Sequence, residues 1–186
     1  FMGRWGSQAQ KDFIYTTGFA AGLCAMLFPV CFVNQTLPGW ELFRFYFCHG
    51  LLLYSAALPL LLGIHRISWK SWYKFAPQFV LMLALVLLDN ILCIYMGITP
   101  GATPENMNLV LWGQNPLWMM GPPEGFEWMA ALLEPFTPEV FLRAGHYVPI
   151  LWYAWSLFIP MSLAALGLFA LVDRKRFRED VKRARN

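Results

Sequence analysis

Two titratable residues lie within long apolar stretches of the chain, and they are the first candidates for chemistry. His49 lies in the stretch 45–64 and Asp89 lies in the stretch 75–97. An ionisable side chain at mid-depth in a bilayer costs at least about 2.5 kcal/mol, so each is a candidate for function. A carboxylate can hold an imidazole in one tautomer, and that imidazole can activate a thiol or a water molecule. A His49–Asp89 pair would therefore supply a general base.

Helical geometry predicts further polar groups at a similar depth. At a rise of 1.5 Å per residue, Asp89 lies about 12 Å, His49 about 9 Å and Cys24 about 13 Å below the outer end of its own helix. We expect these side chains to meet in the outer half of the membrane, with Cys24 or Cys48 as the thiol. The other expected members of this polar cluster, each near one of these residues in sequence, are Arg44, Asn90 and Cys93.

A structural interpretation competes with the catalytic one. A His49–Asp89 hydrogen bond could fix helix packing beside inert thiols, and two residues are weak evidence for catalysis. No metal site is predicted, because the four cysteines lack CxxC spacing. A bis-histidine haem is disfavoured, since His49 and His146 differ in depth and His65 lies on the opposite side. A bound lipid is compatible with the apolar surface, and the aromatic residues could border a pigment; the sequence selects neither cofactor.

The elements that would carry these residues are long apolar helices. The chain is 58% hydrophobic and only 13% charged, whereas a soluble domain carries about 25% charged residues. About 20 apolar residues cross the hydrocarbon core as a helix. The sequence therefore predicts an all-α polytopic membrane protein with about four transmembrane helices. The predicted spans are residues 13–32, 45–64, 75–97 and 147–172.

Charges in the connections predict the orientation of these spans. The connection 64–74 carries Arg66, Lys70 and Lys74 and no acid, and the tail after Val172 is also mainly basic. The segment 98–146 carries five acidic residues and one basic residue. Because basic loops stay in the cytoplasm, both ends are expected there, with 98–146 outside. The expected location is a bacterial plasma (inner) membrane. The chain begins at Phe1, so we also expect the protein to start further upstream.

The predicted outer segment is unusually aromatic for a linker. It contains Trp112, Trp118, Phe126 and Trp128, whereas solvated linkers are poor in aromatic residues. We expect it to fold back over the helices as a lid, with a short amphipathic helix near residues 126–133. The alternative is a contact surface for another protein.

Several short motifs resemble the YwaF-like bacterial integral membrane proteins. They are Phe43-Arg44-Phe45-Tyr46-Phe47-Cys48-His49-Gly50, following Phe28-Pro29, then Asp89-Asn90, Asn106-Met107-Asn108-Leu109 and Gly113-Gln114-Asn115-Pro116. The resemblance covers about residues 15–165. Eukaryotic relatives of that family are thought to be membrane acyltransferases that use a cysteine and a histidine. The resemblance implies that His49 is this histidine. The family's cysteine is expected upstream of Phe1, so Cys24 or Cys48 would have to replace it.

Three functions are compatible with these observations. The first is an integral membrane subunit that packs against partner proteins through its helices and outer segment, and it makes the fewest demands on the sequence. The second is a membrane-embedded acyl-transfer or lipid-modifying enzyme that uses His49 with a cysteine or water. The third is a small proton or solute transporter centred on Asp89. The expected partners are the lipid bilayer and membrane proteins; nothing in the sequence indicates nucleic acid.

Overall fold

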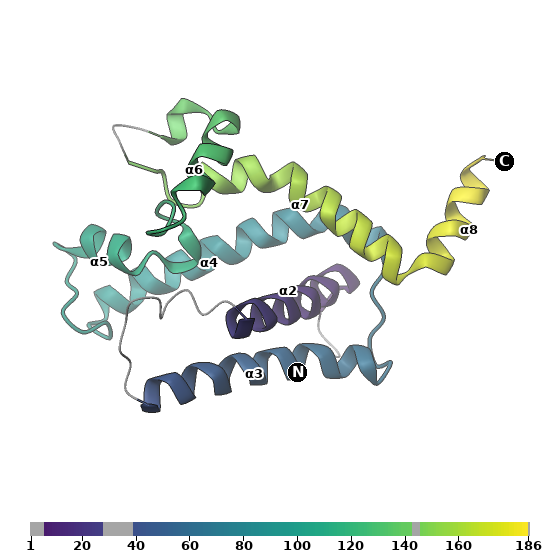
Figure 1. Ribbon diagram of the computed structural model, residues 1–186, viewed down its shortest axis with the longest axis horizontal. Coiled ribbons are helices and arrows are strands. Elements are labelled where there is room, and N and C mark those ends of the chain that lie inside the picture. The colour runs from purple at the N-terminus through teal and green to yellow at the C-terminus, as the bar shows by residue number, and fades with distance from the viewer. Residues whose placement is uncertain (1–5, 28–38, 143–145, 186) are drawn as a thin grey trace. The chain divides into compact units, whose positions relative to one another are not determined.

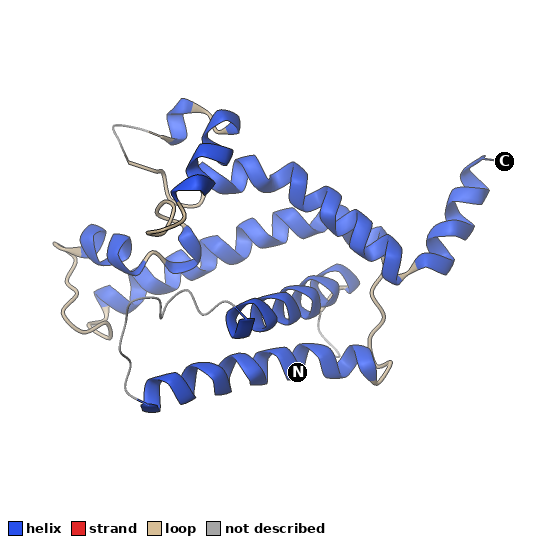
Figure 2. Ribbon diagram, viewed as in Figure 1, coloured by secondary structure: helices blue, strands red, loops and turns tan. Residues whose placement is uncertain are grey.

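The computed structural model describes residues 6–27, 39–142 and 146–185, and within these ranges all regular structure is helical (Figures 1 and 2). This confirms the predicted all-α fold for the described residues. The long helices are α2 (Gln8–Leu27), α3 (Gly39–Leu61), α4 (Phe75–Tyr95) and α7 (Leu151–Val172). The shorter α-helices are α5 (Met107–Gln114), α6 (Glu127–Leu133) and α8 (Arg174–Arg185). The 3-10 turns are η2 (Trp69–Lys74), η3 (Pro116–Trp118), η4 (Glu134–Phe136) and η5 (Glu139–Phe141).

The long helices follow the apolar stretches with shifted ends. Helix α4 starts at the predicted residue, whereas α3 starts at Gly39, six residues before the predicted span. A helix can extend beyond the hydrocarbon layer, because polar residues at its end are satisfied by water or headgroups. The predicted end of the first span, at residue 32, lies outside the described residues. By length and composition, two described helical stretches could cross a membrane: Trp69–Tyr95 and Leu151–Val172, with mean hydropathies of 2.1 and 2.0.

The chain divides into two compact units. Unit 1 comprises residues 1–72 and 166–186, and unit 2 comprises residues 73–165. In unit 1, α2 and α3 pack closely because small residues recur on one face of α2. A Cβ atom on Gly22 would lie 2.9 Å from the Leu53 backbone nitrogen, and one on Gly18 would lie 3.2 Å from the Ala56 Cβ. Small residues four positions apart let two helix backbones approach in this way.

In unit 2, the segment between α4 and α7 folds back onto its own helices. Leu83 of α4 and Trp152 of α7 are fully buried, together with Met119 from the connecting segment. Met129 and Leu133 of α6 pack into the same core. The short helix predicted near residues 126–133 therefore corresponds to α6, with Met129 and Leu133 facing this core and Trp128 and Leu132 exposed.

A left-handed turn directs the connecting segment into the core of unit 2. Asn115 has φ = 37°, and its side chain binds the backbone of Met120 and Gly121 at 2.9 Å each. Asn tolerates this conformation better than most residues, and its amide can bond to nearby backbone groups. The turn places Met119 and Met120 in buried positions.

Candidate functional site

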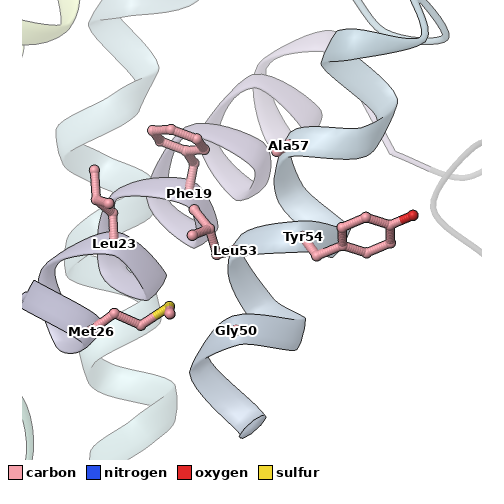
Figure 3. A pocket seen from close by; sticks show the side chains of 7 residues that line it. All are labelled: Phe19, Leu23, Met26, Gly50, Leu53, Tyr54 and Ala57. Carbon is pink, nitrogen blue, oxygen red and sulfur yellow. The ribbon is translucent and has the colours of Figure 1, made fainter. Parts of the chain in front are cut away.

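An apolar groove lies between α2 and α3 within unit 1, with a cavity volume of about 370 Å³ (Figure 3). Ligand sites in proteins commonly span about 300–1,000 Å³. Leu53 reaches from α3 toward α2, while the ring of Tyr54 extends away from α2. The groove is lined by Phe19, Leu23 and Met26 of α2 and by Gly50, Leu53, Tyr54 and Ala57 of α3. This lining is suited to a hydrocarbon chain.

His49 stands beside this groove, one residue before the lining residue Gly50. Its Nδ1 lies 2.8 Å from the Phe45 carbonyl oxygen, and the two rings are 4.1 Å apart. A carbonyl oxygen can only accept, so Nδ1 carries the proton in this hydrogen bond. In the neutral ring, the lone pair then belongs to Nε2. The hydrogen bond therefore fixes the tautomer in which Nε2 can act as a base.

The backbone of His49 also lies close to α2. A Cβ atom on Gly22 would come within 3.0 Å of the His49 carbonyl oxygen. Cys24 follows two residues later on α2, between the groove residues Leu23 and Met26, and its side chain is exposed. The side chain of Cys48, the neighbour of His49 on α3, is also exposed. Both candidate thiols therefore belong to the two helices that form the groove.

The other predicted site residues divide between the two units. Arg44, with an exposed side chain, belongs to α3 of unit 1. Asp89 is exposed on α4 of unit 2, where Asn90 donates to the Val86 carbonyl oxygen at 2.7 Å. Cys93 is half-buried on the same helix. His49 and Asp89 belong to different units, so their contact stays a prediction.

Unit 1 also holds a buried aspartate–histidine pair that the sequence analysis did not predict. Asp12 of α2 is fully buried, and its Oδ1 lies 2.7 Å from Nε2 of His65, which is 8% exposed. Gln8 donates to the same oxygen at 2.9 Å, and the backbone N–H of Ser68 donates to Oδ2 at 3.2 Å. Buried polar groups need hydrogen-bond partners, and both carboxyl oxygens of Asp12 have them.

The turn after α3 brings His65 to Asp12. Gly63 adopts φ = +67°, which glycine reaches without the steric cost of a Cβ atom. The backbone N–H of His65 then donates to the Pro59 carbonyl oxygen at 3.0 Å. Gln8 donates to the Arg66 carbonyl oxygen at 2.7 Å, which ties the loop to the start of α2. One signal was present in the sequence: Asp12 and His65 flank two consecutive apolar stretches at the same predicted membrane side.

A polar junction in unit 2 joins the connecting segment to α7. The Thr137 hydroxyl lies 2.8 Å from the Leu133 carbonyl oxygen and 2.7 Å from that of Trp152, and it also contacts the Ser156 hydroxyl. Nearby, the Tyr147 hydroxyl donates to Glu134 at 2.5 Å. Burial, and then the neighbouring Glu134 carboxylate, raise the pKa of Tyr147 to about 12. Tyr147 therefore stays a protonated donor, and the junction is structural.

Comparison with known proteins corrects the family assignment. No curated protein and no solved structure matches the chain. The model of the TMEM164 family, a eukaryotic family of multi-pass transmembrane proteins, matches residues 1–172.

The resemblance to YwaF-like proteins is therefore wrong. It rested on short runs of aromatic and small residues, which are common in membrane helices of many families. The expected bacterial plasma membrane has no support from a match to a eukaryotic family, whereas the assignment to a membrane stands. Because the match extends over nearly the whole sequence, the chain belongs to the TMEM164 family.

Proposed function

We propose that this chain is a membrane-embedded enzyme that transfers or modifies the acyl group of a lipid, with His49 as its general base. One observation carries the proposal: an apolar groove of about 370 Å³ adjoins a histidine whose Nδ1 is fixed by the Phe45 carbonyl. The groove holds the acyl chain by burial of apolar surface. The carbonyl end of the acyl chain then lies toward His49.

The chemistry needs a base and a nucleophile. His49 Nε2 removes the proton from a thiol or a water molecule, and the resulting nucleophile attacks the acyl carbonyl carbon. The bond from that carbon to the leaving oxygen breaks, and His49 returns the proton to the oxygen. With water as the nucleophile, this step releases the free acid. With a thiol, an acceptor hydroxyl that His49 deprotonates then attacks the acyl-cysteine thioester, the carbon–sulfur bond breaks, and the departing sulfur takes the proton back. Cys24 and Cys48 are the candidate thiols, and water is the alternative. The Phe45 carbonyl orients the ring, so the mechanism does not require contact with Asp89.

The proposed topology has about four membrane spans, formed by α2, α3, α4 and α7, which are 20 to 23 residues long. With both ends on the cytoplasmic side, His49 lies in the outer half of the bilayer. Lipid would enter the groove sideways from that leaflet. The buried Asp12–His65 pair would lie at the cytoplasmic end of the same two helices.

The groove can be tested by narrowing it. We expect Ala57→Leu, which adds bulk to the groove wall, to lower kcat/KM for a long-chain lipid substrate by about 15-fold. The reason is that displacing about two methylenes forfeits about 1.6 kcal/mol of burial. The measurement is acyl turnover of isotope-labelled phospholipid by the protein in proteoliposomes.

The matched control is Ala84→Leu, which makes the same change on an exposed position of α4. It should leave kcat/KM unchanged. Equal effects of the two substitutions would mean that the groove does not hold the substrate.

A second candidate function is that of a subunit in a membrane protein complex. Three apolar residues at four-residue spacing, Trp128, Leu132 and Phe136, are 60%, 57% and 69% exposed on α6 and η4. We expect Leu132→Glu to release the chain from such a complex, because a charge would be buried in an apolar interface. Light scattering of the protein, extracted in mild detergent from its native membrane, would show a lower mass. An unchanged mass, or a wild-type mass of one chain, would exclude this interface.

A further inference from the structure

Helix α8 has two faces of opposite character. It carries seven basic and two acidic residues. Phe177, Asp180 and Val181, which recur at three- and four-residue spacing, are half-buried. The remaining residues of the helix are exposed, and most of them are basic. We call the side opposite Phe177 the outward face; its members are Lys175, Arg176, Arg178, Glu179, Lys182, Arg183 and Arg185.

The half-buried face of α8 is docked onto the start of η2, within unit 1. The Trp69 indole N–H donates to Asp180 at 3.1 Å, and Lys70 pairs with the same carboxylate at 3.0 Å. The Trp69 backbone N–H donates to Asp173, just before α8, at 3.3 Å. The Trp69 and Phe177 rings meet edge to face, with centroids 5.2 Å apart. These contacts fix the rotation of α8 about its axis.

The docking of α8 places its acidic and basic side chains on different sides of the helix. Asp173 and Asp180 are engaged by Trp69 and Lys70, and the hydrogen bond from Lys70 lowers the pKa of Asp180 below its usual range. The outward face then carries six basic residues and only Glu179 as an acid. A positive-inside signal depends only on the number of basic residues near a span. Such a signal requires neither a docked helix nor acidic residues that face away from the basic ones.

We infer that the outward face of α8 binds the anionic headgroups of the membrane surface at the end of α7. Asp173 alone separates the two helices, so α8 starts where a span-length apolar helix ends. A basic residue at such a surface increases affinity for anionic lipid by about fivefold. Arginine is also well suited to phosphate, because its guanidinium offers paired donors. The inference is independent of the proposed acyl chemistry.

Hydrogen exchange of the full chain in lipid nanodiscs tests this surface. Nanodiscs of phosphatidylcholine are compared with nanodiscs containing about a third phosphatidylserine. We expect α8 amides to exchange at least about threefold more slowly in the anionic discs, and high salt should remove the difference, because exposed charges are screened within about 10 Å at 0.1 M salt.

Two triple variants complete the test. Arg178→Gln with Lys182→Gln and Arg185→Gln should lose the added protection, whereas Arg178→Lys with Arg183→Lys and Arg185→Lys should keep it. Glutamine retains helix propensity, and exchange at the Trp69 amide reports whether α8 stays docked. Equal protection in both lipids, or full protection in the glutamine variant, would overturn the inference. Equal protection of the detergent-solubilised protein by inorganic phosphate would show a free-anion site instead and would also overturn it.

Discussion

Replacing His49 by glutamine is expected to lower acyl turnover by about 100-fold to 10,000-fold, because that is the usual contribution of a positioned general base. Glutamine keeps the size and helix propensity of the position but cannot take up a proton. Lipid binding in the groove should remain, since its lining residues are unchanged. Turnover of labelled phospholipid in proteoliposomes gives the rate, and retention of labelled lipid by the purified protein gives the binding.

His146→Gln provides the matched control for this substitution. His146 is exposed and contacts the Trp112 ring at 4.4 Å, away from the groove residues in sequence. The His146→Gln variant should keep the wild-type rate of acyl turnover. Wild-type turnover in the His49 variant would exclude His49 as the base. A lost rate together with lost assembly would favour a purely structural role.

The second large effect is expected at the buried Asp12–His65 pair. Asp12→Ala should reduce the free energy of unfolding by about 3–5 kcal/mol, because it leaves buried His65 without its partner. The Ser68 N–H and the Gln8 side chain lose an acceptor in the same step. Reversible unfolding in mixed micelles, followed by circular dichroism, measures this loss.

A double variant separates the pair from general damage to the fold. Asp12→Leu combined with His65→Phe should cost clearly less than the sum of the single changes, since it removes both hydrogen-bonding partners together. Glu124→Ala, at an exposed acid, is the control and should change stability by less than about 0.5 kcal/mol. If Asp12→Ala is equally mild, the pair does not hold α2 and α3 together.

The apolar stretches predicted the long helices because a membrane span must satisfy its backbone internally. This rule locates the start of α4 and the end of α7, whereas α4 ends two residues before its predicted end and α7 begins four residues after its predicted start. It does not predict that α3 begins at Gly39, because helix ends outside the hydrocarbon are set by local contacts. The sequence also does not predict the groove, because the groove depends on how closely Gly18 and Gly22 let α2 and α3 approach.

The Asp12–His65 pair shows a different limit of sequence reasoning. The two residues are 53 positions apart, and their contact depends on the glycine turn at Gly63. Treating each span separately placed Asp12 outside the first span and His65 on the side opposite His49. A search for complementary charges at neighbouring helix ends would have paired them.

The connecting segment of unit 2 also combines predictable and unpredictable features. Its aromatic content correctly indicated a segment that folds back onto helices. Its path depends on Leu117 and Trp118, which adopt φ = 52° and 59°. Such residues rarely take positive φ values unless surrounding contacts hold them there. Here the Tyr153 hydroxyl donates to the Leu117 carbonyl oxygen at 2.8 Å. The Trp152 indole N–H donates to the Trp118 carbonyl oxygen at 3.2 Å.

The most direct test of the central claim is to map where a lipid acyl chain lies on the protein. A phospholipid with a photoreactive group in the middle of its chain is incorporated into proteoliposomes, and labelled peptides are identified after irradiation. Labelling should concentrate at the α2–α3 groove, at residues such as Leu23, Met26 and Leu53, and should decrease in Ala57→Leu. Labelling spread evenly over the exposed faces of α4 and α7, without enrichment at the groove, would contradict the proposed function.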